Sequence, residues 1–169
     1  MHFCGFGDIF LLTFNLMATP EKLLGKNKKA YFDYEVVEKY ETGIVLVGAE
    51  VKSIKAGRVQ LKGSFASVKN NRVFLDNMHV SPYGPSNNKE YDPLRRKELL
   101  LKRKEIDYLA GMSDEKGLTL VPLEIYLKKG LVKVLLGVCR GKKMHDKRAV
   151  LKKRAISKEI NQGLKIFSR

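Results

Sequence analysis

Short stretches of alternating or clustered apolar residues, separated by turn residues, follow one another along most of this chain. Residues 31–39 alternate aromatic or aliphatic with acidic positions, which predicts a strand. Thr42-Gly43 predicts a turn, and the apolar residues 44–47 predict a short buried strand after it. Residues 18–30 are polar and basic, so we expect the first regular element to begin after them.

Two hairpins are predicted further along. Residues 65–68 and 73–75 flank the tetrapeptide Lys-Asn-Asn-Arg, and asparagine tolerates the left-handed backbone conformation that tight turns require. Residues 118–127 and 131–138 flank Lys-Lys-Gly in the same way. Pro122 lies within this second pair and indicates a strand end or an edge position, because proline cannot donate a hydrogen bond to a sheet.

Helices are expected at two places. Apolar residues three apart between Gly48 and Gly57 predict a short helix that Gly57 closes. After a turn-rich loop at 81–91, Asp92-Pro93 predicts a helix start, since aspartate caps the first N–H groups and proline there loses no hydrogen bond. The helices that follow would carry these apolar residues and stop at a glycine: Leu99, Leu100, Ile106, Leu109, Ala110 and Gly111.

Six or so short strands joined by hairpin turns, with two or three short helices, indicate a mainly β fold. We expect a small antiparallel barrel with the helices packed around it, because closing the sheet removes its exposed edges. One domain with a C-terminal appendage accounts for the 169 residues.

The chain contains 33 Lys and Arg against 18 Asp and Glu, a formal net charge of +15. Such an excess predicts an anionic partner, with nucleic acid as the first candidate and an acidic membrane surface as the second. Residues 140–169 alone contain 11 Lys or Arg and two acids. This basic tail is either a solvated segment that aids solubility or a binding arm. The spacing of its apolar residues fits an amphipathic helix that forms when phosphates neutralise the charges.

The start of the tail favours a binding arm. Gly141 lets the backbone approach a partner closely, and His145 offers a flat ring that can stack on a base. An acidic residue such as Asp146 would not be expected in a segment that bound its partner through positive charge alone. The surrounding Lys and Arg residues supply phosphate contacts, which make the affinity depend on salt.

Residues 1–16 are apolar and contain no Lys or Arg. They lack the basic region of a signal peptide, and the run is shorter than the roughly 20 residues of a transmembrane helix. Our hypothesis is that translation starts at Met17, which the intact mass of the native protein would test. Two cysteines and three scattered histidines form no disulfide framework or metal site, which indicates a cytoplasmic protein with reduced thiols and no cofactor.

No catalytic motif is present, so we expect a binding protein rather than an enzyme. Glu41 and Glu50 are two acids in a strongly basic protein. Each can form a surface salt bridge or a helix cap. Alternatively, each can accept hydrogen bonds from base amino groups or hold an arginine within a cationic groove. The sequence leaves these alternatives open.

Three motifs, taken in order, resemble the SmpB family, which binds SsrA RNA (tmRNA). The first is Gly-Ile-Val-Leu-Val-Gly-Ala-Glu-Val-Lys-Ser-Ile-Lys-Ala-Gly at 43–57. The second is Asp92-Pro93 with the leucine triplet at 99–101, and the third is Gly-Lys-Lys-Met-His-Asp-Lys-Arg at 141–148. Each motif alone is weak, but their combination and order are specific to the family.

The resemblance covers about Asn27 to Arg154 and implies three segments. Residues 1–26 would be an N-terminal extension, and residues 27–140 an RNA-binding, OB-like β-barrel with peripheral helices. Residues 141–169 would be a basic tail that is disordered when free and helical on the ribosome.

The resemblance also implies a function in trans-translation. The protein would bind the tRNA-like domain of tmRNA and bring it, with elongation factor Tu through alanyl-tmRNA, to ribosomes stalled on messages that lack a stop codon. Its partners would be RNA and the ribosome, mainly the small subunit and its rRNA, and neither DNA nor a membrane. It would rescue the ribosome and mark the incomplete protein without itself being a catalyst.

Two groups of site residues follow from the matched motifs. The residues expected to bind tmRNA are Asn27, Lys28, Glu41, Glu50, Lys52, Ser53 and Leu99. The residues expected to face the ribosomal decoding centre are Gly141, Lys142, Lys143, His145, Asp146, Lys147 and Arg148, with the later tail in the empty mRNA channel.

The chain departs from the family pattern at Phe32, where a histidine is usual, and at Lys97-Glu98, where Arg-Lys is usual. Cys139 replaces an alanine, which we interpret as a packing change. Two other functions remain as alternatives. One is a general oligonucleotide-binding barrel, which usually carries clustered surface aromatics. The other is a small nuclease, which would require Glu41, Glu50 and Asp146 to converge on a metal ion.

Overall fold

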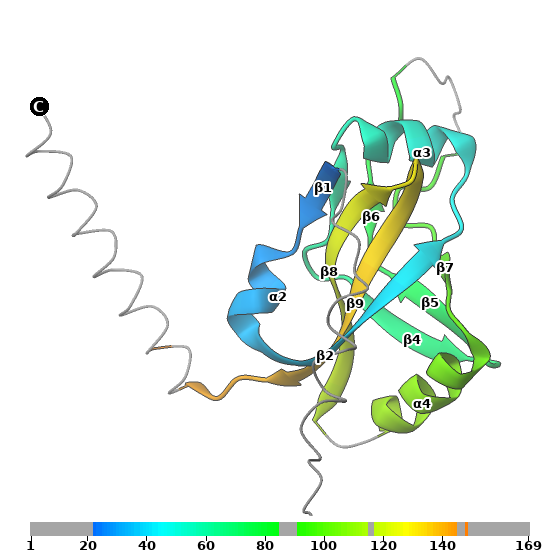
Figure 1. Cartoon of the computed structure of the whole chain (residues 1–169). Helices are drawn as coiled ribbons and strands as arrows, with labels where there is room; N and C mark the ends of the chain where they lie inside the picture. The colour runs from blue at the N-terminus through cyan, green and yellow to red at the C-terminus, as the bar shows by residue number, and fades with distance from the viewer. Residues whose placement is uncertain (1–21, 85–90, 115–116, 145–147, 149–169) are drawn as a thin grey trace, which may run out of the picture.

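The computed structural model describes residues 22–84, 91–114, 117–144 and 148 (Figure 1). Strands predominate in this part of the chain. The strands are β1 (Lys22–Lys26), β2 (Tyr34–Ile44), β3 (Val59–Gln60), β4 (Phe65–Lys69), β5 (Arg72–Asp76), β6 (His79–Val80), β7 (Lys97–Leu100), β8 (Leu118–Lys128) and β9 (Leu131–Gly141). The helices are α2 (Lys28–Asp33), α3 (Gly48–Lys55) and α4 (Arg103–Asp114).

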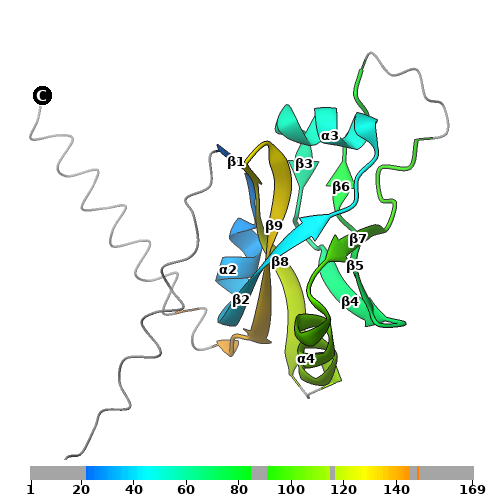
Figure 2. The same ribbon diagram turned by 45° about the vertical axis from the view of Figure 1, so that its right-hand side comes forward.

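Seven of the described strands form one antiparallel sheet in the order β1-β8-β4-β5-β7-β2-β9. Strand β9 pairs with both β2 and β8. Each strand in the path from β8 through β4, β5, β7 and β2 to β9 pairs with the next, and β9 pairs back with β8. Strands β3 and β6 form a separate pair. Helices α3 and α4 lie at opposite ends of the sheet, and α2 lies on the flank of β8 and β9 (Figures 1 and 2). No described helix is long and apolar enough to cross a membrane.

The apolar residues form two clusters. The larger cluster contains residues of the β4–β5 hairpin and of the β8–β9 hairpin, together with Ile54 of α3 and Leu109 of α4. The smaller one lies where α2 covers β8 and β9, and its buried members are Ala30, Val121, Leu123, Tyr126, Leu135 and Cys139. Burial raises the pKa of the Cys139 thiol to about 11, so this cysteine is a neutral packing residue, as we expected.

Both predicted hairpins and the predicted short helix are confirmed. In the turn between β4 and β5, Asn70 and Asn71 have φ angles of 49° and 57°. In the turn between β8 and β9, Lys129 and Gly130 have φ angles of 51° and 74°. Helix α3 ends before Gly57, whose φ of 77° matches the glycine termination that its sequence predicts.

The beginning of the fold differs from the prediction. Strand β1 (Lys22–Lys26) pairs with β8, so regular structure is already present before residue 31. Residues 28–33 form helix α2, and the strand predicted from residue 31 begins at Tyr34.

The turn predicted at Thr42-Gly43 and the separate strand predicted at 44–47 are also wrong, because β2 continues to Ile44. Thr42 is buried and donates its hydroxyl to the carbonyl oxygen of Val134 at 3.1 Å. A Cβ atom at Gly43 would lie only 3.2 Å from the Cβ of Leu100. The glycine therefore allows β7 to approach β2 closely and does not reverse the chain.

Asp92-Pro93 begins a turn and not a helix. The Asp92 side chain accepts a hydrogen bond from the Leu94 backbone N–H at 2.9 Å, and the leucines that we expected in a helix lie in β7. This strand pairs with β5 and β2, two partners that are distant in sequence. Helix α4 begins only at Arg103 and continues through Gly111 to Asp114.

Pro122 lies inside β8, not at a strand end or edge. The β8–β9 pairing shifts register between Pro122 and Glu124, which marks a bulge, one of the positions where a sheet tolerates proline. The Pro122 carbonyl accepts a hydrogen bond from the Asn27 side chain at 3.1 Å. The bulge therefore helps to attach the segment that leads into α2.

Candidate nucleic-acid interface

A row of polar side chains follows the outer face of β8, the face that α2 covers at one end. Glu124, Tyr126 and Lys128 are two residues apart, which places them on the same face of the strand. Glu124 lies 2.8 Å from the Nζ of Lys26 and accepts a hydrogen bond from the Tyr31 hydroxyl at 3.0 Å. The row therefore joins α2 and β1 to the β8–β9 turn.

Glu41 of β2 joins the other end of this row. Its carboxylate lies 2.7 and 3.0 Å from the Nζ of Lys128 and accepts a hydrogen bond from the Tyr126 hydroxyl at 2.9 Å. Burial acts to raise the pKa of Glu41, but the hydrogen bonds from Lys128 and Tyr126 and the charge of Lys133 more than offset it, so its pKa is lowered. Glu41 is therefore an ionised group that orders cations on this face.

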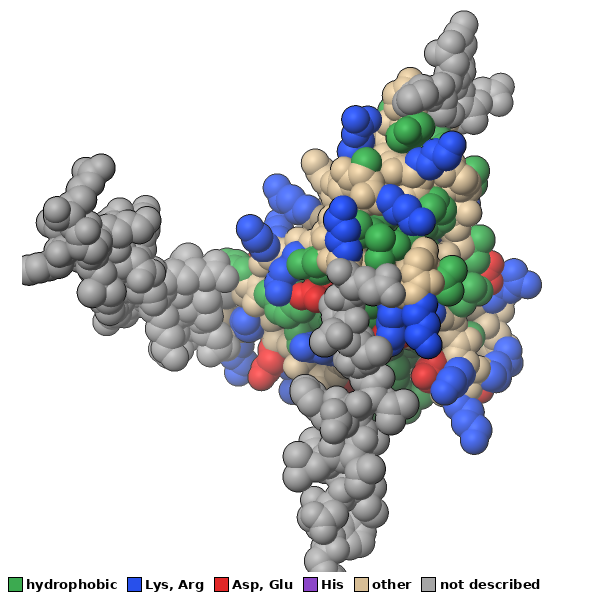
Figure 3. All heavy atoms as spheres, turned by 45° about the horizontal axis from the view of Figure 1, so that its top comes forward, with side chains coloured by type: hydrophobic (Ala, Val, Ile, Leu, Met, Phe, Trp, Pro, Cys, Tyr) green, Lys and Arg blue, Asp and Glu red, His purple; other side chains and the backbone are tan. Residues whose placement is uncertain are grey.

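A depression of about 260 Å³ lies between α3, the β8–β9 turn and the last residues of β2, Gly43 and Ile44, which follow Glu41 in the strand. Leu100 and Leu131 line it and are 56% and 63% exposed, and Lys133 lies at its edge. Exposed aliphatic side chains next to lysines offer apolar contact to a base and positive charge to a phosphate. Figure 3, which views the molecule with this end turned forward, shows many more Lys and Arg side chains than acidic ones.

Asn27 and Lys28 lie at the other end of the row, and their roles differ. Asn27 is 4% exposed, donates to the carbonyl oxygens of Leu61 at 2.8 Å and of Pro122, and accepts from the Ala30 N–H at 3.0 Å. All its polar atoms are used inside the protein, where it caps α2. Lys28 is exposed on the first turn of α2 and is available to a phosphate.

Glu50 belongs to a buried ionic network and not to an exposed face. Its carboxylate binds Arg95 through two hydrogen bonds of 2.7 and 3.2 Å and accepts from the Val47 N–H at 2.9 Å. Lys97 is fully buried and places its Nζ 3.5 Å from the same carboxylate. Burial acts to raise the pKa of Glu50, but the hydrogen bonds from Arg95 and Val47 lower it overall, whereas burial lowers the pKa of Lys97.

Two further residues expected to bind RNA are also buried. Leu99 is 2% exposed and lies in the main core, and Ser53 is fully buried and donates its hydroxyl to the Ser81 carbonyl oxygen. Their side chains are therefore not presented to a ligand. Lys52 is exposed on α3, with its Nζ 5.7 Å from the centre of the Tyr83 ring.

The start of the basic tail is attached to α2. Gly141 ends β9 opposite Tyr34, and Lys142 donates its backbone N–H to the Asp33 carbonyl oxygen at 3.0 Å. The Nζ of Lys142 donates to the Tyr31 carbonyl oxygen, also at 3.0 Å. Lys143 and Arg148 are exposed. His145, Asp146 and Lys147 lie outside the described residues.

Among the described residues, no cluster of three His, Cys, Asp or Glu side chains could hold a metal ion. Glu41 and Glu50, two of the carboxylates that the nuclease alternative requires, are held in separate networks by Lys128 and by Arg95. The geometry of the described part therefore offers binding chemistry, with cations, a hydrogen-bonded carboxylate and exposed aliphatic groups.

A model of the SmpB protein family matches residues 24–166 of this chain. The chain belongs to the SmpB family. One curated relative is the SsrA-binding protein of Bacillus subtilis (strain 168), 55% identical over 144 residues, which are 85% of this chain and 92% of the relative. Another is the SsrA-binding protein of Treponema denticola, 52% identical over 148 residues, or 88% of this chain and 96% of the relative.

A solved structure leads to the same family. It is described as "tmRNA-SmpB: a journey to the center of the bacterial ribosome" and is 46% identical to this chain. The match has a TM-score of 0.61 and covers 71% of this chain and 85% of that chain.

In this SmpB-family chain, the motifs did not point to the partners of Glu41, Tyr126 and Lys128, or to the exposed neighbour of Leu99, Leu100. Nor did they point to Leu131 and Lys133, which line the depression together with Leu100. The alternation of polar residues in β8 was a readable signal for two of them. The exposure of Leu100 was not readable, because the leucine triplet had been assigned to a helix.

Proposed function

We propose that this chain binds the tRNA-like domain of SsrA RNA (tmRNA) and brings it to stalled ribosomes for trans-translation. The observation that carries the proposal is the 55% identity to an SsrA-binding protein over 144 residues. Elongation factor Tu would deliver the alanyl-tmRNA together with this protein. Rescue of the ribosome and tagging of the incomplete protein follow, with the protein as a binding partner and not as an enzyme.

We assign RNA binding to the outer face of β8, β9 and β2 with α2. Lys28, Lys128 and Lys133 would contact phosphates, and Leu100 and Leu131 would contact an exposed base. Asn27 would act indirectly, because its side chain caps α2 and so fixes the position of Lys28. Glu41 would position Lys128, and Lys52 would add a cation at the α3 end.

The proposed architecture is an OB-like barrel that carries this face. The cyclic order of strand neighbours from β8 through β4, β5, β7, β2 and β9 supports a closed sheet. Closed antiparallel barrels of this kind bind oligonucleotides on one face. The barrel domain would span 27–140, with β1 as an additional strand contributed by the segment before it.

The tail at 141–169 would bind the small ribosomal subunit. Its start is positioned by the hydrogen bonds of Lys142 to α2, which support a defined exit direction from the body. Residues 141–148 would occupy the decoding centre, and the later residues would form a helix in the empty mRNA channel. Because both partners are translation components, we place the protein in the cytoplasm.

The proposal is tested by reconstituted translation of a message that lacks a stop codon, with tmRNA, elongation factor Tu and purified ribosomes. Adding the full chain should convert the stalled peptide into a longer, tagged and released product. Omitting either the chain or tmRNA should leave the peptide on the ribosome. Equal release with and without the chain would contradict the proposal.

A further inference from the structure

Two depressions lie side by side on the flank of α2, and Asn27 and Lys29 line both of them. The first, of about 330 Å³, lies between the β1–α2 junction and residues 59–62. Four lysines line it, namely Lys26, Lys28, Lys29 and Lys62. Such a concentration of ammonium groups suits a phosphate backbone.

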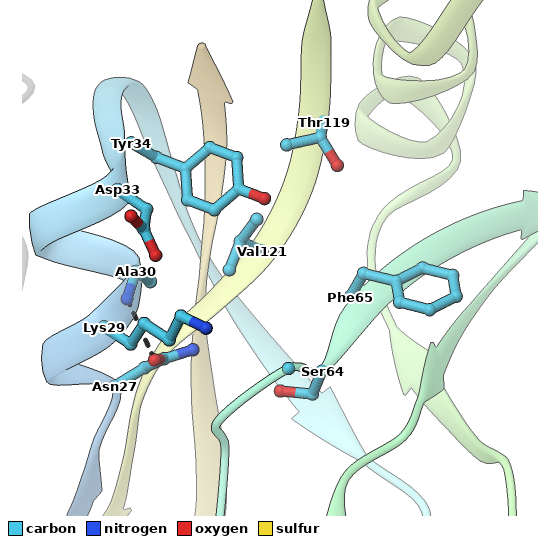
Figure 4. A pocket seen from close by; sticks show the side chains of 10 residues that line it. Asn27, Lys29, Ala30, Asp33, Tyr34, Ser64, Phe65, Thr119 and Val121 are labelled. Atoms are coloured by element: carbon cyan, nitrogen blue, oxygen red, sulfur yellow. Dashed lines mark hydrogen bonds between the residues drawn. The ribbon is translucent and has the colours of Figure 1, made fainter. Parts of the chain in front are cut away.

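The second depression, of about 340 Å³, has a different character. Val121 and Thr119 of β8 form its floor, α2 forms one wall and residues 63–65 form the other (Figure 4). The Tyr34 ring lies above the floor with its hydroxyl directed toward Thr119, and the Lys29 side chain reaches in from α2. An aromatic ring, an apolar floor and a few hydroxyl groups are typical of a small-ligand pocket.

The walls of this second depression are held together by buried hydrogen bonds. Asn27 accepts from Ala30 of α2 and donates to the Leu61 carbonyl oxygen at 2.8 Å. The Ser64 hydroxyl donates to that same oxygen at 2.6 Å. Because both walls are tied through Asn27 and Leu61, the pocket is formed before any ligand arrives, which lowers the entropic cost of binding.

We propose that the second depression binds one unstacked nucleotide of an RNA partner while its phosphates lie in the lysine-lined depression. Proteins that read single-stranded RNA stack splayed bases on aromatic rings and contact the base edges with polar groups. Here the Tyr34 ring would stack on the base, and the Thr119 hydroxyl would contact its edge. Lys29, which lines both depressions, would bind the connecting phosphate.

This inference rests on the proposed function, because it assumes that the chain binds RNA, but it adds a separate contact away from Glu41. The nucleotide can come from the tRNA-like domain of tmRNA or from the rRNA of the small subunit. Both sources share the same chemistry, and the experiment separates them.

The direct test is ultraviolet crosslinking of the full chain to each of the two RNAs, followed by mass spectrometry of the crosslinked peptides. We expect a crosslink at Tyr34 or within residues 63–65 with one of the two RNAs. Binding without any crosslink in these segments, combined with unchanged affinity of the variants below, would overturn the inference.

Two variants complete the test. Thr119→Phe fills the pocket and Tyr34→Leu removes the ring while keeping an apolar side chain, and each should weaken binding to the same RNA at least tenfold. Leu94→Phe, at a position before β7 that is 52% exposed and outside both proposed binding surfaces, is the matched control for added bulk and should bind as the wild type does. Thermal unfolding verifies that each variant is folded, and Tyr34→Leu decides the test if Thr119→Phe is not.

The possible failures are distinguishable. If the wild type prefers tmRNA and the two pocket variants bind equally well, only this inference fails. If the wild type itself binds neither RNA above the level of duplex DNA, the proposed function fails as well.

Discussion

Glu41 of β2 lies against Lys128 of β8, 87 residues further along the chain, with the Nζ of Lys128 2.7 and 3.0 Å from the two carboxylate oxygens. Tyr126 donates its hydroxyl to the same carboxylate. Glu41 therefore gathers groups from β8 onto a face that also carries Lys133 and the exposed Leu131. The proposed RNA interface depends on this arrangement more than on any single cation.

Glu41→Lys should weaken tmRNA binding at least tenfold without unfolding the protein. The new ammonium group would lie beside Lys128 and Lys133, and Tyr126 would lose its acceptor. Because the pair is only partly buried, we expect a loss of about 1–3 kcal/mol in the free energy of unfolding. Filter binding to the tRNA-like domain measures the first effect, and urea denaturation measures the second.

The matched control is Asp107→Lys on α4, at the opposite end of the sheet from α3 (Figure 1). It makes the same change in charge and also removes an ion pair, the one with Arg103. We expect wild-type affinity or a slight increase. Equal affinities for Glu41→Lys and Asp107→Lys would contradict the placement of Glu41 in the interface.

Leu99 and Leu100 should separate stability from binding. Leu99 is 2% exposed, so Leu99→Ala should lower the free energy of unfolding by about 2–5 kcal/mol while the folded protein binds RNA normally. Leu100 is 56% exposed, so Leu100→Ala should change stability little and weaken RNA binding severalfold. If only Leu99→Ala reduced the affinity of folded protein, the assignment of Leu100 to the interface would be wrong.

The sequence could predict local turns but not the pairing of strands that are distant in the chain. The hairpins were readable because Asn70-Asn71 and Lys129-Gly130 are local signals for positive φ angles, which the backbone adopts. The helix at Asp92-Pro93 was misread because an aspartate that binds a nearby N–H fits a turn as well as a helix cap. Pairing of β7 with β5 and β2 decides between them, and such pairing is not visible in local sequence.

The site was predictable only where a motif could be matched. Lys28 and Lys52 are exposed cations, as a phosphate contact requires. The motif at 43–57 could not distinguish Lys52 from Glu50 and Ser53, which stand in the same motif but are buried. Burial depends on how α3 packs on β6 and on the turn at Arg95, and these elements are distant in the sequence.

Glu50→Gln should destabilise the protein by about 3–5 kcal/mol at pH 7, because it leaves Lys97 buried without a full charge partner. The pKa of Glu50 is lowered in the folded protein, so the stability that its charge contributes is complete above its ordinary value of 4.5 and is lost as the pH falls below it. The difference between wild type and variant should therefore shrink on acidification.

Urea denaturation at several pH values between 7 and 3 measures this difference. Glu41 and Glu124 also have lowered pKa values, so the wild type should lose stability over the same acidic range. A difference between wild type and Glu50→Gln that stays constant from pH 7 to pH 3 would show that the charge of Glu50 contributes nothing to stability.

Changing Asp146, Lys147 and Arg148 together to alanine should abolish tagging in reconstituted translation while leaving affinity for the tRNA-like domain nearly intact. The reason is the proposed division of labour, in which the body binds tmRNA and the tail binds the ribosome. The control replaces Arg103, Lys104 and Asp107 of α4 by alanine, with the same change in net charge. A large loss of tmRNA affinity in the tail variant would contradict this division.

The most direct test of the central claim is the affinity of the full chain for three ligands at about physiological salt. The ligands are the tRNA-like domain of tmRNA, an ordinary tRNA and duplex DNA of equal charge. Nonspecific binding lies near ~10⁻⁴–10⁻⁶ M under such conditions, and specific recognition is orders of magnitude tighter. We predict a strong preference for the tmRNA domain. Equal and steeply salt-dependent binding to all three would contradict specific recognition and leave a general cationic nucleic-acid binder.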